Sequence, residues 1–572
     1  MIDYKVQIAQ IIAKQEIGLT AEEIAEMIEV PTDSKNGDFA FPCFRLAKTM
    51  RKAPQMIAAD VASSIENESI FDKVEQVNAY VNMFICKDAF VRNVVSEVIS
   101  LGCGYGKSNV GEGKKVIVEF SSPNIAKPFH IGHIRSTVIG NSIYKLYDAT
   151  GYDVVRINHL GDYGTQFGKM IVAYRLWGSE EELEKNPIKS LLKYYTKFHE
   201  EAEKDPSLDD KARETFAKLE NGEPEEVELW KRFRELSLEE FSRVYKMLDI
   251  EFDSYAGESF YSDKMPAVLK ELKDKNLMHE SRGVQIVDLE DYDMPPAVIT
   301  KSDGSSLYAT RDIAAAIYRK QHYDFYKNIY VVATQQNLHF KQWKQVLALM
   351  GYAWEEDCIH VPFGLVSLEE GTMSTRKGRV VFLEDVLNKA VEKTREIISE
   401  KNTSGIDIDE ISKEVGIGAV IFQELSNNRI KDYVFSWDKI LNFDGETGPY
   451  VQYTHARASS VLRNASQQEL DRIKNCDIKD FSYVTSDSAY ELTKLIYRVP
   501  GVVREAAAKY EPSILTRHLI DIAQSFNRFY HDEHILVDNE EEKVAKLALV
   551  YASKVTIANC LAILGIKAPD KM

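Results

Sequence analysis

Hydrophobic positions change their spacing along the chain, and the first region mixes helical and strand-like patterns. Residues 4–15 and 21–29 carry apolar residues at the spacing of amphipathic helices, whereas residues 74–86 are strand-like. A glycine-rich stretch ends this region near Gly113. We therefore expect an N-terminal α+β domain over residues 1–112.

Strand-like and helix-like segments alternate over residues 113–380. Residues 116–120 form a short apolar run, residues 131–150 have a helical pattern, and residues 154–160 are again strand-like. Strand, helix and strand with short links favour a parallel sheet. The alternation returns later in this region, at residues 283–289, 312–322, 329–333, 338–350 and 360–366. The two halves predict one doubly wound sheet with an acidic helical insertion near residues 178–282.

The pattern after residue 380 is helical throughout. Predicted helices cover residues 383–400, 408–428, 449–464, 488–509, 512–532 and 541–563. We expect a helical connector over residues 381–445 and an all-α bundle over residues 446–572. The expected fold class is multidomain α/β, with a Rossmann-type doubly wound parallel sheet as the catalytic core, helical insertions, an N-terminal α+β domain and a C-terminal helical bundle.

The charge balance limits how the chain can bind nucleic acid. It has 71 Lys and Arg against 89 Asp and Glu, a net charge of −18. Such acidity argues against a protein that simply coats nucleic acid, because phosphates attract surplus cations. Bases and acids balance over residues 450–535, however, and tyrosines lie among the bases there. Local RNA binding by stacking is one interpretation, and core packing of these tyrosines is the other.

Cysteine spacing and hydropathy indicate the cellular compartment. The six cysteines form no Cys-x-x-Cys pair, so we expect reduced thiols, no structural zinc and no other metal site. No window approaches eighteen consecutive apolar residues. These features predict a cytoplasmic protein that does not bind membranes.

The segment EFSSPNIAKPFHIGHIRST, residues 119–137, joins the first strand of the sheet to its first helix. Ligands of open α/β sheets bind at such junctions, where helix N-termini attract phosphates. His130 and His133 lie on one side of the first helical turn, and Gly132 leaves room for a flat ring. The pair would suit the oxygens of a triphosphate at its α-phosphorus. The alternative is that the histidines only cap the helix; metal ligation is less favoured, because no third ligand is near.

His-Ile-Gly-His after a strand resembles the HIGH signature of class I aminoacyl-tRNA synthetases. Longer strings narrow the resemblance to arginyl-tRNA synthetases, of the type also found in the eukaryotic cytosol: residues 119–137, HLGDYGTQFG at 159–168, LYATRDIAAA at 307–316 and GPYVQYTHAR at 448–457. This resemblance implies a monomer that joins arginine to ATP, with Mg²⁺, and releases pyrophosphate. It then transfers the arginyl group to the 2′-hydroxyl of the terminal adenosine of tRNA(Arg).

The residues for arginine follow partly from chemistry and partly from the resemblance. A guanidinium group needs planar acceptors, and Asp312, at a predicted helix start, is the first candidate. An acid that only stabilises a helix start is the alternative. The resemblance assigns the side chain of arginine to Asp312 and Tyr308, assisted by Gln336. It assigns the α-ammonium group to Glu119 and Asn124, and Glu119 is costly to bury in its apolar strand unless paired.

The second nucleotide motif departs from the class pattern. MSTRKGRVV, residues 373–381, matches Lys-Met-Ser-Lys-Ser, but Thr375 replaces the lysine usually credited with holding the triphosphate. By resemblance, ATP binds at His130, Gly132, His133, Met373, Ser374 and Arg376. Lys127 and Lys377 are candidates for the missing charge, and we favour Lys127. The expected catalytic set is therefore His130, His133, Lys127 and Lys377.

The resemblance also implies tRNA contacts at both ends of the chain. The outer corner of tRNA is assigned to residues 1–112, at Asn78, Tyr80 and Asn82; the anticodon is assigned to Tyr453, Arg457, Tyr530 and Met572. Enzymes of this family commonly need bound tRNA before they activate the amino acid. Two alternatives stay open: another class I synthetase, such as the cysteinyl or glutamyl enzyme, and a non-catalytic tRNA-binding relative.

Overall fold

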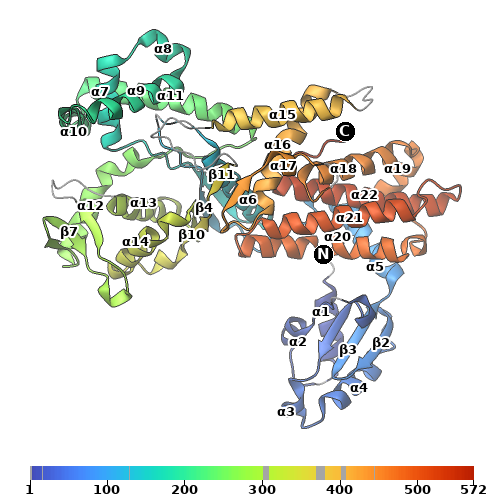
Figure 1. Ribbon diagram of the computed structural model, residues 1–572. Coiled ribbons are helices and arrows are strands. Elements are labelled where there is room, and N and C mark those ends of the chain that lie inside the picture. Colours follow the sequence, from blue (N-terminus) through green and yellow to red (C-terminus); the bar gives the residue numbers. More distant parts are fainter. Residues whose placement is uncertain are drawn as a thin grey trace. The chain divides into compact units, whose positions relative to one another are not determined.

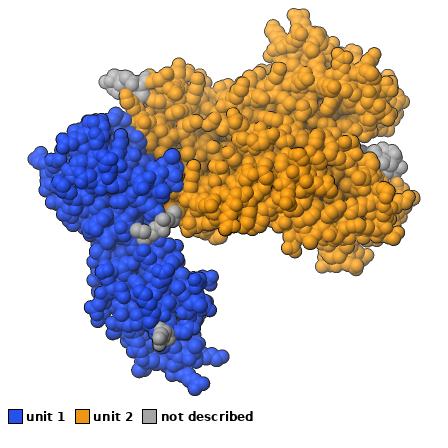
Figure 2. All heavy atoms as spheres, turned by 180° about the vertical axis from the view of Figure 1, so that it is seen from behind, with its two compact units in different colours: residues 1–105, 457–498, 521–556 blue, residues 106–456, 499–520, 557–572 orange. Residues whose placement is uncertain are grey.

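The computed structural model describes residues 3–572 except residues 16, 32, 126, 128, 301–307, 369–380, 401–406, 443 and 444 (Figure 1). Contacts divide the chain into two compact units (Figure 2). Unit 1 comprises residues 1–105, 457–498 and 521–556, and unit 2 comprises residues 106–456, 499–520 and 557–572.

The N-terminal part of unit 1 is an α+β fold, as expected. Its antiparallel sheet has the order β1-β3-β2, with β1 Phe39–Pro42, β2 Phe71–Val77 and β3 Tyr80–Ile85. Asn78 stands in the turn between β2 and β3 with φ 53°, a conformation that asparagine tolerates better than most residues. The helices are α1 Tyr4–Ala13, α2 Ala21–Met27, α3 Leu46–Met50, α4 Pro54–Ile65 and α5 Lys87–Leu101.

The core of unit 2 is a four-stranded parallel sheet of order β10-β9-β4-β5. Its strands are β4 Lys115–Glu119, β5 Asp153–Ile157, β9 Lys327–Ala333 and β10 Cys358–Phe363. From β4 the chain passes through α6 (Ile134–Ala149) to β5 on one side, and then returns to β9 and β10 on the other. The strand order therefore reverses between β4 and β9, and ligands of open sheets bind at such a reversal. This arrangement confirms the doubly wound sheet.

Two expectations about strands were wrong. Residues 283–289 contain β7 (Val284–Val287), but β7 belongs to a separate antiparallel sheet with β6 (His279–Ser281) and β8 (Ala297–Thr300). An apolar run predicts a strand without naming its partners, so it was assigned to the wrong sheet. The region after residue 380 is also not entirely helical, since β12 (Tyr433–Phe435) pairs in parallel with β11 (Val366–Leu368).

Helices make up the insertion and most of the remaining chain. Between β5 and β6 the helices are α7 Thr165–Trp177, α8 Glu180–Lys185, α9 Pro187–Ala202, α10 Ser207–Glu220, α11 Pro224–Met247 and α12 Met265–Asp274, and α8 to α12 fall within the expected insertion. Two further helices, α13 Tyr308–Tyr323 and α14 Asn337–Leu349, pack against the parallel sheet or its neighbours. The C-terminal helices are α15 Leu383–Ser399, α16 Ile408–Ser426, α17 Trp437–Ile440, α18 Gly448–Arg463, α19 Gln467–Lys474, α20 Asp487–Ala508, α21 Ser513–Asp532 and α22 Glu540–Ile563.

Helix α22 is long and apolar enough to cross a membrane by length and composition, but 67% of its most apolar window is buried within the protein. That burial is typical of a core helix in a helical bundle.

Candidate nucleotide and amino acid site

The two histidines cap the helix start and also face the reversal point of the sheet. His130 is the N-cap of the short 3₁₀ turn Ile131–His133 that precedes α6, and its Nδ1 accepts a hydrogen bond from the Gly132 amide at 3.1 Å. Nδ1 of His133 in turn accepts from the His130 amide at 3.1 Å, and the ring centroids lie 4.0 Å apart. Because capping uses both Nδ1 atoms, Nε2 of each ring is the atom left for a ligand.

Burial keeps both rings neutral at physiological pH. Burial, reinforced by the charge of Lys127, lowers the pKa of His130 to about 4. Burial and the neighbouring His130 lower the pKa of His133 to about 3. The ammonium of Lys127 also lies 5.8 Å from the ring centroid of Tyr195 on α9. The turn thus combines two neutral rings with one cation.

Residues 381–383, around the end of the basic motif, form backbone hydrogen bonds with this turn. The Ile131 amide donates to the Val381 carbonyl at 3.1 Å, and the Leu383 amide donates to the Phe129 carbonyl at 2.9 Å. Met373, Ser374, Arg376 and Lys377 lie outside the described residues.

Asp312 lies in the second turn of α13, because the helix begins at Tyr308. The expectation that Asp312 stands at a helix start was therefore wrong; residues 301–307 carry no apolar pattern from which the earlier start could be read. Oδ2 of Asp312 lies 2.5 Å from Nε2 of His339 on α14, and both side chains are partly exposed. The side chain of Tyr308 is outside the described part of the chain.

Glu258 is a second acid near Asp312. It is largely buried, and its Oε2 lies 3.1 Å from Nη1 of Arg311. Burial raises the pKa of Glu258 to about 7; Arg311 opposes this rise, and the charges of Asp312 and Asp162 add to it. Sequence reasoning missed Glu258 because several acids lie within residues 251–263 and none is distinguished by its local pattern.

Glu119 ends β4, the strand at the reversal point. Its register neighbours are Ile157 on β5 and Tyr330 on β9. The buried carboxylate does have the partner that its burial requires, since Oε2 lies 2.6 Å from Nη1 of Arg319 on α13. Sequence reasoning did not identify Arg319, because it is far from Glu119 in the sequence.

Asn124 and Gln336 lie on segments that follow β4 and β9. Asn124 forms a backbone bridge with Gly161, and a Cβ at Gly161 would lie 2.2 Å from Oδ1 of Asn124. Glycine at position 161 therefore allows the Asn124 side chain to lie against the backbone. Gln336 is exposed at the N-cap of α14.

The predicted N-terminal tRNA contacts differ in accessibility. Asn78 is exposed in the β2–β3 turn, and Tyr80 meets Phe44 edge to face at 5.2 Å between centroids. Asn82 is 4% exposed, so it presents the least surface of the three.

The predicted C-terminal tRNA contacts include two exposed tyrosines. Tyr453 is 36% exposed and Tyr530 is 42% exposed. The guanidinium of Arg457 lies 5.3 Å from the ring centroid of Tyr530 and bonds the side chain of Asn527. Met572 is partly buried against the apolar cluster Ile398, Ile411 and Val415.

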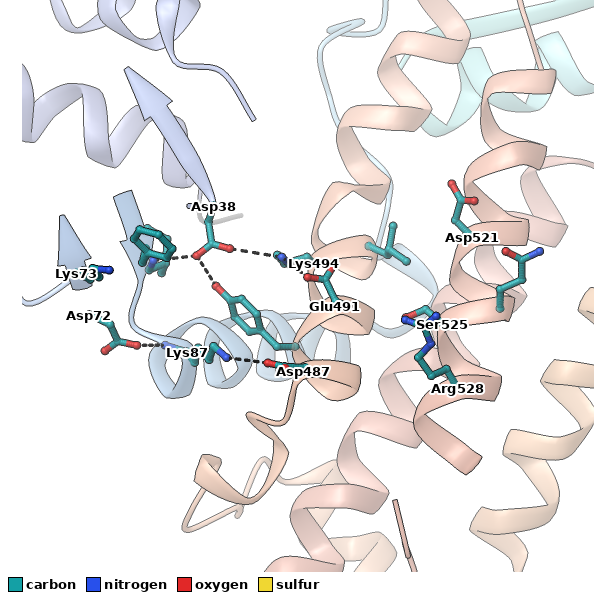
Figure 3. A pocket seen from close by; sticks show the side chains of 15 residues that line it. Asp38, Asp72, Lys73, Lys87, Asp487, Glu491, Lys494, Asp521, Ser525 and Arg528 are labelled. Atoms are coloured by element: carbon teal, nitrogen blue, oxygen red, sulfur yellow. Dashed lines mark hydrogen bonds and ion pairs between the residues drawn. The ribbon is translucent and has the colours of Figure 1, made fainter. Parts of the chain in front are cut away.

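A cavity of about 800 Å³ in unit 1 lies between the N-terminal sheet and helices α20 and α21 (Figure 3). Its charged groups mostly contact one another. Asp38 accepts from the Tyr490 hydroxyl at 2.8 Å and lies 3.6 Å from Nζ of Lys494, and Nζ of Lys87 lies 3.3 Å from Asp487. We therefore interpret this region as a packing contact within unit 1 that is held by ion pairs and hydrogen bonds, and not as a ligand site.

Within the described ranges, no three His, Cys, Asp or Glu side chains gather closely enough to hold a metal ion.

Three protein families match the chain. The family "tRNA synthetases class I (R), catalytic domain" matches residues 94–437, more than half of the chain. "DALR anticodon binding domain" matches residues 451–572, and "Arginyl tRNA synthetase N terminal domain" matches residues 3–85.

Relatives match over the full length. Arginine–tRNA ligases of Clostridioides difficile and Halothermothrix orenii are 58% and 56% identical over 572 residues, and each alignment covers 100% of both chains. These relatives are bacterial, so they do not support the expected likeness to the type found in the eukaryotic cytosol.

Solved structures share the fold. The structure titled arginyl-tRNA synthetase of Thermus thermophilus has a TM-score of 0.80 at 24% identity and covers 100% of both chains. That of Plasmodium falciparum also has a TM-score of 0.80 at 24% identity, with 99% of this chain and 98% of the other covered. From the catalytic-domain match and the full-length relatives together, we conclude that this chain belongs to the class I arginyl-tRNA synthetases.

Proposed function

We propose that unit 2 of this arginine–tRNA ligase activates arginine at the carboxyl ends of β4 and β9. The observation that supports this site most is the meeting of two opposite environments at one reversal point. Neutral His130 and His133 with the cation Lys127 form one side. The acids Glu119 and Asp312 form the other. Both lie near the buried Tyr330 of β9, since burial raises the pKa of that tyrosine and the charges of both acids add to the rise.

In the proposed first step, the carboxylate of arginine attacks the α-phosphorus of ATP and pyrophosphate leaves. No side chain acts as a nucleophile, so orientation and charge stabilisation supply the acceleration. Nε2 of His130 and His133 would donate to phosphate oxygens as neutral rings. Mg²⁺ is expected to arrive with the ATP phosphates, which supply ligands of the kind it prefers.

We assign to Lys127 the charge that Thr375 does not supply in the basic segment. Lys127 already lies close enough to His130 to lower the pKa of that ring. Its position three residues before His130 would place the ammonium beside the triphosphate. Met373, Ser374, Arg376 and Lys377 remain proposals for the opposite side of ATP.

Arginine would bind with its guanidinium at Asp312 and Glu258 and its α-ammonium at Glu119 and Asn124. Planar carboxylates form charge-assisted bonds with a guanidinium, which are stronger than neutral hydrogen bonds. His339, 2.5 Å from Asp312, would orient the first carboxylate. Tyr308 would share the side chain of arginine with Asp312, and Gln336 would assist there.

The second step would transfer the arginyl group to the 2′-hydroxyl of the terminal adenosine of tRNA(Arg). We propose that residues 1–112 contact the outer corner of tRNA, that residues 113–380 catalyse, that residues 381–445 connect to the stem, and that residues 446–572 bind the anticodon. A monomer in the cytoplasm is the expected working form.

Pyrophosphate exchange tests the activity directly. Exchange of labelled pyrophosphate into ATP should require arginine and tRNA(Arg), and omission of either should abolish it. Exchange supported by cysteine or glutamate in place of arginine would indicate another class I synthetase. Binding of tRNA without any exchange would indicate a non-catalytic relative.

Two variants should fail in opposite ways in this assay. Asp312→Asn should raise KM for arginine by about 10- to 100-fold, because one charge-assisted bond is lost.

Lys127→Ala should lower kcat by about 100-fold with little change in KM for ATP, because its charge acts mainly in the transition state. Asp288→Asn and Lys193→Ala, at exposed ion pairs, are the matched controls. Normal arginine KM in the first variant, or unchanged turnover in the second, would contradict the assignment.

A further inference from the structure

Arg319 is fully buried and forms a polar network that includes Glu119, a residue of the proposed arginine site. Its Nη1 lies 2.6 Å from Oε2 of Glu119, and its Nε donates to the Tyr261 hydroxyl at 3.3 Å. Its Nη2 lies 3.4 Å from Nδ1 of His159. Tyr330, the register neighbour of Glu119, lies below the guanidinium at 5.5 Å from centroid to Cζ.

This network brings together three separate parts of the sequence. Glu119 ends β4, His159 follows β5, and Arg319 lies near the end of α13. The guanidinium fork has donors in several directions, so one side chain can hold all three partners at fixed angles. A lysine ammonium would supply the charge without this planar geometry.

The carboxylate of Glu119 is buried, and its printed ion pair uses one of its two oxygens. Oε2 lies 2.6 Å from Nη1 of Arg319, and no second ion pair of Glu119 is found among the described residues. A buried carboxylate is costly without an opposite charge and rotates freely without a fixed partner. Arg319 supplies both the charge and the orientation through Oε2, an arrangement in which Oε1 can face a ligand.

We propose that Arg319 is a positioning residue, which holds Glu119 so that Oε1 accepts a hydrogen bond from the α-ammonium group of arginine. Arg319 itself does not touch the substrate. This inference rests on the proposed role of Glu119 and deepens it.

The position of Arg319 on α13 connects both ends of the substrate. Asp312 and Arg319 are seven residues apart, two turns along one face of the helix and about 10 Å along its axis. Asp312 would hold the guanidinium directly, and Arg319 would set the carboxylate that holds the α-ammonium. One rigid helix therefore fixes the distance between the two acceptors, as selection by substrate length requires.

Two competitors of arginine separate positioning from a general loss of structure. Agmatine retains the guanidinium and the ammonium, and 5-guanidinopentanoate retains the guanidinium but lacks the α-ammonium. In Arg319→Met, KM for arginine and Ki for agmatine should rise by about 10- to 100-fold, as expected for a misplaced charged acceptor. Ki for 5-guanidinopentanoate and KM for ATP should change by less than about threefold.

Two further variants keep the test decisive if Arg319→Met folds poorly. Arg319→Lys retains the charge and should show the same selective effect, but smaller. In the Glu119→Gln background, adding Arg319→Met should change KM for arginine by less than about threefold, because the carboxylate to be positioned is gone. Arg213→Met, at the exposed Arg213–Asp210 pair on α10, is the matched control and should behave as wild type.

The outcomes separate this inference from the proposed function. Wild-type protein without arginine-dependent exchange would contradict the proposed function. Normal exchange together with an equal loss for agmatine and 5-guanidinopentanoate, or with additive effects of the Glu119 and Arg319 changes, would overturn the positioning role alone.

Discussion

At the scale of single residues, one side chain often serves structure and chemistry together. His130 and His133 use Nδ1 to cap the turn before α6, which was the purely structural alternative, and keep Nε2 for a ligand. The same capping holds the rings in place before ATP arrives. Helix capping and nucleotide binding by His-x-x-His are therefore both consistent with the geometry.

The neutral state of His133 makes stability depend on pH. An unfolded histidine has a pKa of about 6.5, whereas burial lowers the pKa of His133 in the folded chain to about 3. Because the folded value is the lower one, the stability from the neutral ring is fully present above about pH 6.5 and is lost as the pH falls toward 3. By about pH 5 the loss should reach up to about 2 kcal/mol.

Urea unfolding at about pH 7.5 and pH 5 measures this effect. His133→Asn, whose side-chain oxygen can replace Nδ1 as the capping acceptor, should lose less stability on acidification than wild type. His531→Asn, at an exposed histidine, is the control and should follow wild type. Equal acid sensitivity of wild type and His133→Asn would contradict the buried neutral ring.

At the scale of elements, Arg135 joins the start of α6 to two other segments. Its Nη1 donates to the Gly364 carbonyl at 2.9 Å, between β10 and β11, and to the Lys431 carbonyl at 2.8 Å, before β12. Its Nε lies 3.5 Å from Oε2 of Glu424 on α16, and both side chains are fully buried. The histidine turn and the strand that enters the basic segment are thus held by one guanidinium.

Arg135→Met should destabilise unit 2 by about 3 kcal/mol, because two buried carbonyls and a buried carboxyl lose their donor. Thermal unfolding followed by calorimetry measures the change. Arg213→Met removes the exposed Arg213–Asp210 pair and should cost less than about 1 kcal/mol. A shift of the unfolding midpoint in Arg135→Met no larger than in this control would argue against a stabilising role of the Arg135 contacts.

At the scale of the whole molecule, an acidic chain has to bind RNA through local surfaces. The net charge of −18 gives no general attraction for phosphate. The exposed ring of Tyr530, with the Arg457 guanidinium 5.3 Å from its centroid, is the kind of surface on which an unpaired base stacks. Recognition by stacking would add affinity without a basic surface.

Tyr530→Ala should raise KM for tRNA by about 5- to 150-fold, which corresponds to the loss of one stacked base. Aminoacylation at varied tRNA concentration measures it, and saturating tRNA should restore most of the rate. Tyr292→Ala, at an exposed tyrosine in the turn before β8, is the control. An unchanged KM for tRNA in Tyr530→Ala would remove this residue from the proposed interface.

The sequence by itself determined the elements and the class of chemistry. Helical spacing, strand runs and the motif around His130 are local, so they can be recognised without knowing the fold. The central strand β4, the helix α6 and the helical C-terminal region were predicted in this way.

Only the tertiary structure decided which distant residues meet. It placed β7 in a separate antiparallel sheet, paired β11 with β12, and brought Arg319 to Glu119, His339 to Asp312 and Glu258 to Arg311. Side chains far apart in the sequence leave no periodic signal, because their pairing depends on the order of strands and the packing of helices. The charge that completes a buried acid therefore emerges only when the chain is folded.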